Sequence, residues 1–365
     1  MLAVADLLRC PIENERENDA MIFRQLYDTT SSTYTYVLAD ETARKALIID
    51  PVFGQVDRDL ALLHELGLML ELVADTHAHA DHITAAWLLK QKTGCTIASA
   101  EVINAEHVDL YLKDGDTFGV PGVTLRALST PGHTDGCMSF VMNDESMVFT
   151  GDALLIRGCG RSDFQQGSAH KLYQSITGKL FALPDRCVVY PAHDYQGRTV
   201  SSIGEEKQFN ARVGDGANET DFVQYMQAMK LPHPKMIDEA VPANLRSGAP
   251  EDGRLPVTPD WAEIHLTYAG VPELDFEWLE HHLDDVTVLD VRLPAEIKDC
   301  PVHARLVDVH IPLNELNDRI GEIPKDKPVV ALCRSGRRSS LAVTILKQNG
   351  FEKVASLSHG LRQIA

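Results

Sequence analysis

The segment THAHADH, residues 76–82, places three histidines and one aspartate within seven positions. Three other segments carry ligand-type residues directly after short apolar runs: STPGHTDG contains His133, VFTGDALL contains Asp152 and VVYPAHDY contains His193. Each of these residues, like His77, stands just beyond a predicted strand, and side chains at the same end of neighbouring strands can converge on one point. The pattern predicts a metal site and leaves open which metal binds and how many ions.

A second chemical feature is the segment PVVALCRSGRR, which delivers Cys333 to the end of a predicted strand just before a predicted helix. Backbone N–H groups of such a loop and the positive end of the helix stabilise a thiolate, and nearby arginines lower the thiol pKa further. Arg338 stands five residues after Cys333. The ring is therefore Cys-x4-Arg, one residue shorter than the Cys-x5-Arg loop that encircles a phosphate. We expect Cys333 to be the reactive cysteine, with Arg334, Arg337 and Arg338 supplying positive charge.

The elements that must position these residues fall into two patterns. Residues 21–232 alternate short β-rich runs with helical stretches, and residues 273–365 alternate strand and helix signals as in a small parallel α/β unit. Residues 233–272 are rich in proline and predict a linker, and residues 1–20 predict an N-terminal extension. The sequence thus indicates two domains of different architecture.

Composition excludes several classes of protein. A net charge of -19 opposes binding to nucleic acid, and no apolar run approaches the roughly 18 residues that span a membrane. The first 20 residues fit neither a secretory nor a transit peptide, so we expect a cytoplasmic protein. Seven scattered cysteines, an odd number, favour reduced thiols over a disulfide framework.

The histidine-rich segments together, H-x-H-x-D-H followed by PGHT, GD and PAH, resemble the metallo-β-lactamase fold. The resemblance implies an α/β protein, an αββα sandwich with its metal site at one edge. Two kinds of relative share the motif. A binuclear zinc thioester hydrolase of the glyoxalase II kind would use four residues at one metal (His77, His79, His133, Asp152) and four at the other (Asp81, His82, His193 and the shared Asp152).

A persulfide dioxygenase uses one iron instead. Residues 151–168, 190–213 and 234–246 resemble that family, and the resemblance covers about residues 21–246. It implies one Fe(II) per chain, since two histidines and one carboxylate leave open positions for substrate and O2. The implied iron ligands are His77, His133 and Asp152, with hydrogen-bonding support from His79, Asp81, His82 and His193.

In that family the substrate is glutathione persulfide, which O2 oxidises to sulfite with release of glutathione. Glutathione carries two carboxylates, and a chain of charge -19 needs fixed cations to hold them. Arg161 and Arg212 match basic residues of the family motifs, and Tyr195 is the expected hydrogen-bonding neighbour.

The cysteine loop CRSGRR resembles the C-x-x-G-x-R pattern of single-domain rhodaneses, and the resemblance covers residues 273–365. It implies a small α/β rhodanese domain in which Cys333 carries sulfur between thiosulfate and glutathione. The whole chain is thus interpreted as a persulfide dioxygenase fused to a rhodanese, compatible with a homo-oligomer. Two alternatives stay open: a zinc hydrolase with an accessory rhodanese, and a sulfur carrier or persulfide sensor.

Overall fold

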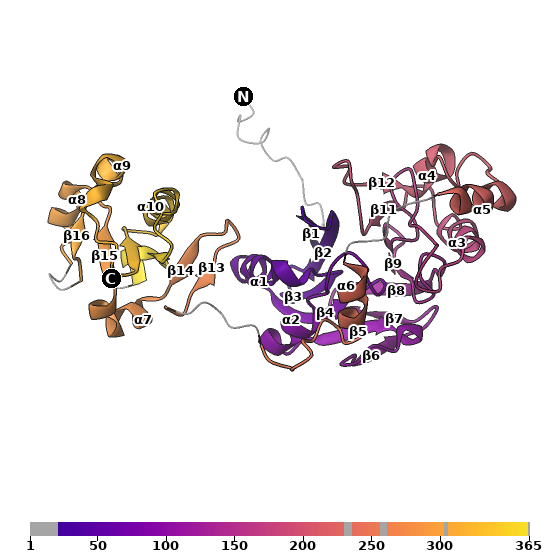
Figure 1. Ribbon diagram of the computed structural model, residues 1–365, viewed down its shortest axis with the longest axis horizontal. Helices are drawn as coiled ribbons and strands as arrows, with labels where there is room; N and C mark the ends of the chain where they lie inside the picture. Colours follow the sequence, from indigo (N-terminus) through magenta and orange to yellow (C-terminus); the bar gives the residue numbers. More distant parts are fainter. Residues whose placement is uncertain (1–20, 230–235, 256–260, 303–305, 364–365) are drawn as a thin grey trace, which may run out of the picture.

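The computed structural model describes residues 21–229, 236–255, 261–302 and 306–363, which form two domains (Figure 1). The predicted N-terminal extension lies outside these residues. Among the helices of the described segments, none combines the length and the apolar character needed to cross a membrane.

The first domain is a sandwich of two six-stranded sheets with helices on both outer faces. One sheet has the order β1-β2-β3-β4-β5-β6, and the other has the order β12-β11-β10-β9-β8-β7. This arrangement confirms the predicted αββα sandwich. The strands of the first sheet are β1 Met21–Asp28, β2 Thr33–Asp40, β3 Lys45–Ile49, β4 Met69–Ala74, β5 Thr96–Ala100 and β6 Leu110–Leu112. Those of the second are β7 Thr117–Val120, β8 Val123–Ser129, β9 Met138–Met142, β10 Met147–Gly151, β11 Val188–Pro191 and β12 Ser201–Ser202.

Alternation along the strands builds this layered core. In β2, Tyr36 and Leu38 pack between the two sheets, whereas Val37 packs toward the helices that cover the first sheet. Every residue of β2 is buried because both faces of its sheet are covered. The covering helices are α1 Val56–Glu65 and α2 Ala86–Thr93 on the first sheet, and α3 Ala169–Ser175, α4 Ile203–Phe209 and α5 Glu219–Ala228 beside the second.

Helix α6, Ile237–Asn244, lies in the segment for which proline content predicts a linker, and it packs onto the first domain. The Asn244 amide donates to the carbonyls of His79 and His82 at 2.8 and 2.9 Å, and its oxygen accepts from the Thr84 N–H. Ala249, a few residues later, belongs to the core under the first sheet. The segment after residue 236 is therefore joined to the loop that carries the histidine-rich motif.

The second domain is a small α/β unit whose sheet has the order β13-β14-β18-β17-β15-β16. All its pairs are parallel except β13 with β14, and apolar clusters cover both faces. The fold class predicted for the C-terminal segment is confirmed. Its strands are β13 His265–Leu266, β14 Pro272–Leu274, β15 Thr287–Asp290, β16 Val309–His310, β17 Val329–Leu332 and β18 Val354–Leu357. Its helices are α7 Phe276–His281, α8 Pro294–Asp299, α9 Leu316–Arg319 and α10 Arg337–Gln348.

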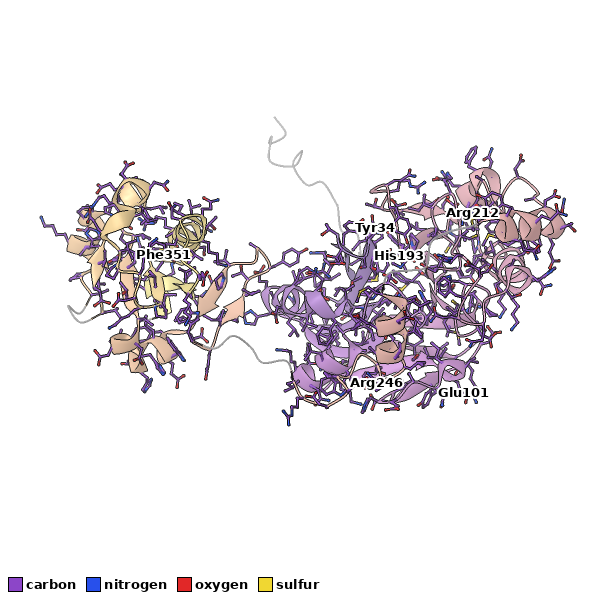
Figure 2. The ribbon with its side chains drawn as sticks, in the orientation of Figure 1. Tyr34, Glu101, His193, Arg212, Arg246 and Phe351 are labelled. Carbon is purple, nitrogen blue, oxygen red and sulfur yellow. The ribbon has the colours of Figure 1, made fainter. Side chains whose placement is uncertain are left out.

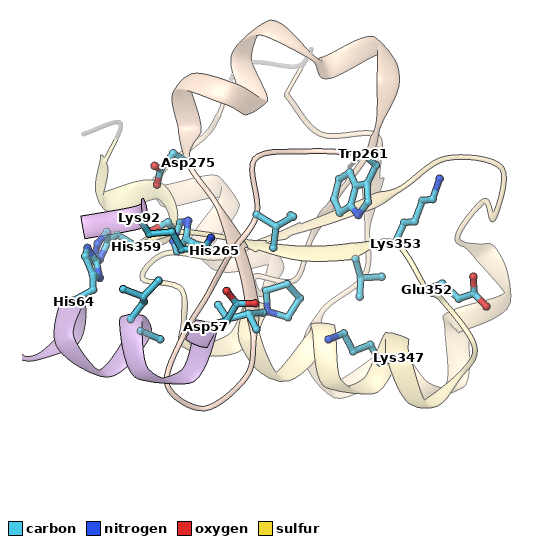
Figure 3. Close-up of a pocket in the computed structure, with 17 residues that line it drawn as sticks. Asp57, His64, Lys92, Trp261, His265, Asp275, Lys347, Glu352, Lys353 and His359 are labelled. Carbon is cyan, nitrogen blue, oxygen red and sulfur yellow. The ribbon is translucent and has the colours of Figure 1, made fainter. Parts of the chain in front are cut away.

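The domains meet where α1 faces the β13–β14 hairpin. The Tyr268 N–H donates to Glu65 at 2.8 Å, and a cavity of about 1170 Å³ opens beside this contact (Figure 3). His64 and Lys92 line it from one domain and His265 and His359 from the other. None of the predicted metal ligands and no part of residues 333–338 lines this cavity, so it is separate from both predicted sites.

Candidate functional site

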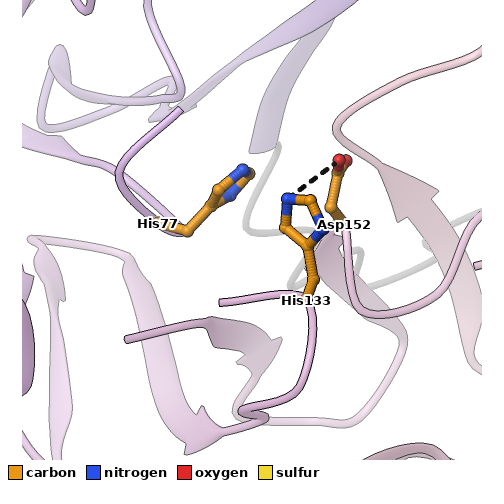
Figure 4. Close-up of side chains that lie close together, drawn as sticks. All are labelled: His77, His133 and Asp152. Atoms are coloured by element: carbon orange, nitrogen blue, oxygen red, sulfur yellow. Dashed lines mark ion pairs between the residues drawn. The ribbon is translucent and has the colours of Figure 1, made fainter. Parts of the chain in front are cut away.

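Three potential metal ligands converge at one edge of the first domain. His77 follows β4, His133 follows β8 and Asp152 follows β10, so strands of both sheets deliver them to one place. One ligand atom of each lies within 4.8 Å of the others, and His133 Nε2 lies 3.5 Å from Asp152 Oδ2 (Figure 4). A single ion with bonds of about 2.1 Å can join donors at such separations.

Both histidines of this cluster are oriented through Nδ1. The hydroxyl of Thr76 lies 3.0 Å from Nδ1 of His77, and the carbonyl of Arg161 lies 2.6 Å from Nδ1 of His133. Each ring therefore keeps Nε2 for a metal, which is the usual support of a ligating histidine. Burial, reinforced by the neighbouring histidines, holds the pKa of His77 well below its usual range, so this ring is neutral, as metal binding requires.

Asp152 completes the donor set with an oxygen that suits a cation. Its Oδ1 atom is buried and has no hydrogen-bond partner among the described residues. Buried carboxylate oxygens normally accept a hydrogen bond, so one that accepts none beside two imidazole nitrogens fits a divalent metal. The three residues thus fit the iron that the sequence resemblance implies, and they fit other divalent metals as well.

The remaining residues of the histidine-rich set also lie together. One ligand atom each of His79, Asp81 and His193 lies within 4.8 Å of the others, and the rings of His79 and His82 are 4.3 Å apart. His79 Nδ1 and His82 Nε2 are buried, and neither has a hydrogen-bond partner in the part of the chain that the structure describes. The binuclear alternative assigns His79 to the first metal, whereas the structure groups His79 with Asp81 and His193.

Polar side chains of neighbouring strands hold the second set. Asp50 Oδ1 lies 3.1 Å from His79 Nε2. The Thr33 hydroxyl lies 3.1 Å from Asp81 Oδ2 and 3.4 Å from His193 Nδ1. Hydrogen bonds of this kind fix the orientation of side chains around a metal.

His193 lies between two carboxylates, with Asp81 at 3.5 Å and Asp152 at 3.8 Å from its Nε2 atom. Burial lowers the pKa of His193, but Asp152 and Asp81 outweigh this effect and raise the pKa to about 10. Tyr195, predicted to contact substrate, stacks on the same ring at 5.9 Å and is 70% exposed. Figure 2 shows Tyr34 of β2 near His193, in line with the hydrogen bond from the Tyr34 N–H to the carbonyl of residue 192.

Arg161 is joined to the metal cluster through its backbone. Its carbonyl is the partner of His133, and its guanidinium donates to Asp163 at 2.6 Å and lies 5.0 Å from the Phe164 ring centroid. The Phe164 ring in turn meets the edge of His133 at 5.5 Å. The structure thus places this predicted substrate residue beside the predicted metal ligand His133.

Arg212 reaches the same loop from the segment before α5. Its Nη1 donates to the Cys159 carbonyl at 2.5 Å, and its guanidinium lies 5.8 Å from the Tyr225 ring centroid. Burial raises the pKa of Cys159 to about 11, although Arg212 lowers it, so this thiol is protonated at neutral pH. Arg212 is therefore held next to the loop that precedes Arg161.

Gly160 separates these two residues for a steric reason. An added Cβ would lie 2.4 Å from the Asp152 carbonyl oxygen and 2.9 Å from Nδ1 of His133. Only a residue without a side chain lets the loop approach both ligands so closely.

In the second domain, Cys333 follows β17, and α10 begins at Arg337. Burial raises the pKa of the Cys333 thiol, but the Ser339 hydroxyl and the backbone N–H groups of Ser335, Arg338 and Ser339 outweigh burial and lower it. Hydrogen-bond donors of the loop thus lie around the Cys333 sulfur. Arg334 and Arg337 are exposed at the loop surface.

Arg338 is turned toward an acidic partner that the sequence analysis did not single out. Glu296 of α8 accepts from Nη1 and Nη2 of Arg338 at 2.5 and 2.6 Å. This pair holds the pKa of Glu296 down, at about 2. The third arginine of the loop is thus matched by a carboxylate.

Comparison with known proteins adds the family. The model of the metallo-beta-lactamase superfamily matches residues 28–193, and the model of the rhodanese-like domain matches residues 275–365. The human protein named persulfide dioxygenase ETHE1, mitochondrial, is 48% identical over 229 residues, which are 62% of this chain and 89% of that protein. The chain belongs to the persulfide dioxygenase family. The rhodanese-like match confirms that this member of the family is a fusion.

Solved structures agree with the two-domain fold. The crystal structure of ETHE1 from Myxococcus xanthus is 51% identical, covers 62% of this persulfide dioxygenase family member and 99% of its own chain, and has a TM-score of 0.60. A metallo-beta-lactamase from Staphylococcus aureus is 22% identical, covers 94% of this chain and 99% of its own, and has a TM-score of 0.59. At that identity the second comparison supports the fold alone.

Several residues around the predicted metal cluster were not predicted. The sequence contains a signal that could have identified Asp50. This residue ends the apolar run KALIID, just as His77 follows another strand of the same sheet. Gln165, which donates to the Ala78 carbonyl at 3.0 Å, and Asn244 had none, since each acts on the motif from far along the chain.

Proposed function

We propose that this chain oxidises glutathione persulfide with O2 in its first domain and transfers sulfane sulfur through Cys333 in its second. The observation that carries the first part is the cluster of two imidazole donors and one carboxylate at His77, His133 and Asp152. One Fe(II) bound there would supply the O2 chemistry that zinc, which has no redox chemistry, cannot supply. One persulfide, one O2 and one water balance one glutathione, one sulfite and two protons.

The chain's own residues position substrate and ligands in this proposal. His79, Asp81, His82 and His193 support the ligands from the second donor set, with hydrogen bonds to Asp50 and Thr33. Arg161 lies beside His133, Tyr195 beside His193 and Arg212 beside Cys159, and these three would hold the carboxylates of glutathione. Charged hydrogen bonds of this type contribute about 1.5–3 kcal/mol each.

In the second domain, the Cys333 thiolate attacks the outer sulfur of thiosulfate. The S–S bond breaks, sulfite leaves with the electron pair, and a Cys333 persulfide remains. The thiolate of glutathione then attacks the outer sulfur and restores the Cys333 thiolate. Arg334, Arg337 and Arg338 would attract the anionic donor, and the product, glutathione persulfide, is the substrate of the first domain. The proposed location is the cytoplasm, and the proposed assembly is a homo-oligomer.

Metal content and oxygen uptake test the first activity. We expect about one iron per chain, oxygen uptake with glutathione persulfide, and loss of both in His133→Ala. Two zinc ions per chain together with thioester hydrolysis would instead establish the hydrolase, which the second donor set favours. Sulfur loading of Cys333 without any oxygen uptake would establish the carrier.

A coupled assay tests the fusion. With thiosulfate and glutathione as the only sulfur sources, the wild-type protein should consume oxygen, because each domain then supplies the other's substrate. Cys333→Ser should abolish this uptake and spare uptake with added glutathione persulfide, whereas His77→Ala should abolish both and spare sulfur transfer. Wild-type uptake from thiosulfate by Cys333→Ser would show that the second domain does not feed the first.

A further inference from the structure

Glu296 of α8 forms an ion pair with Arg338 of the cysteine loop. Its two carboxylate oxygens meet the two terminal nitrogens of Arg338 in a forked pair, at 2.5 and 2.6 Å. Such forks fix the guanidinium plane as well as its position. The two side chains are 31% and 32% exposed, so solvent reaches the pair and it does not lie in the core.

The carboxylate is itself held in place. Glu296 Oε2 accepts from the Leu293 N–H at 3.0 Å, which ties it to the first turn of α8. That turn follows Arg292, a buried residue paired with Asp290 at 2.7 Å. Glu296 is therefore a fixed negative charge, and its lowered pKa, caused by Arg338, keeps it ionised throughout the neutral range.

The charge of the loop depends on this pair. Arg338 interacts electrostatically with Cys333 as well as with Glu296. In the described ranges no ion pair is recorded for Arg334 or Arg337, so Arg338 is the arginine of the loop whose charge is balanced. Removing the carboxylate would leave the same guanidinium with its full charge beside the cysteine.

We propose that Glu296 is a positioning residue that limits the attraction of the cysteine loop for thiosulfate and so sets which sulfur donor Cys333 prefers. The inference rests on the sulfur transfer proposed above. Thiosulfate concentrates two negative charges around the sulfur that is transferred, whereas glutathione persulfide carries one there and its others at the distant carboxylates. A change in local charge therefore acts on thiosulfate about twice as strongly.

The test variant is Glu296→Gln, which keeps the side-chain length and removes the charge. Glu322→Gln is the matched control: Glu322 forms a fork with Arg319 at 2.8 and 2.9 Å in the same domain, on the segment that leads into the amino end of β17. Cys333 lies at the carboxyl end of that strand. The two variants change net charge equally.

Sulfur transfer is measured without oxygen in both directions, from thiosulfate to glutathione and from glutathione persulfide to saturating sulfite. Glu296→Gln should lower KM for thiosulfate about fivefold and KM for the persulfide about twofold, with less than about a twofold change in kcat. Glu296→Asp, which keeps the charge, should retain the wild-type ratio of the two KM values. An unchanged ratio in Glu296→Gln, or equal loss with both donors, overturns the proposal.

A readout that needs no sulfur transfer separates this inference from the proposed function. Alkylation of Cys333 by iodoacetamide, a neutral reagent, should reach half its maximal rate at a lower pH in Glu296→Gln than in wild type or Glu322→Gln, because the unbalanced guanidinium favours the thiolate. If wild type transfers no sulfur but this shift is observed, the proposed function fails and the role of Glu296 stands. An unshifted midpoint overturns the role of Glu296.

Discussion

Gly160→Ala would place a methyl group against two of the three proposed metal ligands. The new Cβ would lie 2.4 Å from the Asp152 carbonyl oxygen and 2.9 Å from His133 Nδ1, and ordinary contacts begin at 3.4 Å. The Asp152 backbone must therefore retreat by about 1 Å, or the loop must move by as much. Gly160 has no positive φ, so the effect is steric and does not arise from backbone conformation.

This displacement is several times what a metal site tolerates, since bond lengths vary by about 0.2 Å. Loss of the support of a ligand costs roughly 10–100-fold in metal affinity, and overpacking costs about 1–3 kcal/mol of stability. We expect Gly160→Ala to fold with a lowered Tm and to bind Fe(II) at least about tenfold more weakly. Anaerobic titration of metal-free protein with Fe(II) measures the affinity, and thermal unfolding measures the stability.

The control lies in the same loop. A Cβ at Gly158 meets only the Arg212 guanidinium, at 3.8 Å, which is an ordinary contact. Gly158→Ala should therefore keep wild-type iron affinity. Wild-type affinity in Gly160→Ala, or equal losses in both variants, would refute the argument that the loop is packed against the metal ligands.

Two further predictions concern stability. Burial, partly offset by Arg58, raises the pKa of Asp59 to about 6, so the folded state holds a proton that the unfolded state has released above pH 3.8. Between about pH 4 and pH 7 the free energy of unfolding of the wild type should fall relative to that of Asp59→Asn, by up to roughly 3 kcal/mol. Urea unfolding measures this difference, and a difference that stays constant across the range would contradict the expectation. Arg157→Gln should destabilise the first domain by about 2–4 kcal/mol, because it leaves the fully buried Glu206 carboxylate without its cationic partner. In urea unfolding, the double variant Arg157→Gln/Glu206→Gln should regain part of the stability that Arg157→Gln loses. If the second substitution lowers the stability further by an additive amount, a charge effect is excluded.

The sequence predicted those features that depend on local pattern. Short apolar runs that end near His77, His133 or Asp152 indicate the ends of strands. Strand ends of one fold can meet at one edge of the sheets, so the positions of these residues along the sequence were enough to predict that they converge. The Cys333 cradle was predictable for the same reason, since a strand, a loop and a helix follow one another directly along the chain.

Partners distant in sequence could not be predicted in this way. Glu296 lies 42 residues before Arg338, and an acidic residue in a helical segment usually faces solvent. Helix α6 was not predicted because it contains Pro242, and proline within a segment usually indicates that no helix forms there. Tertiary packing of α6 outweighs that local preference, and no pattern in the sequence shows what it packs against.

The anchorage of α6 decides where this protein can be cut. A fragment that ends at residue 232 would lack Asn244, and the carbonyls of His79 and His82 and the N–H of Thr84 would lose their partner. Such a fragment should be prone to aggregation and poor in metal even if every ligand is present. A fragment that continues through Ala249 retains both the helix and its place in the core. The junction between the domains should therefore be placed after residue 249. This applies when the domains are expressed separately, when they are exchanged between relatives, and when a different sulfurtransferase is fused to the first domain.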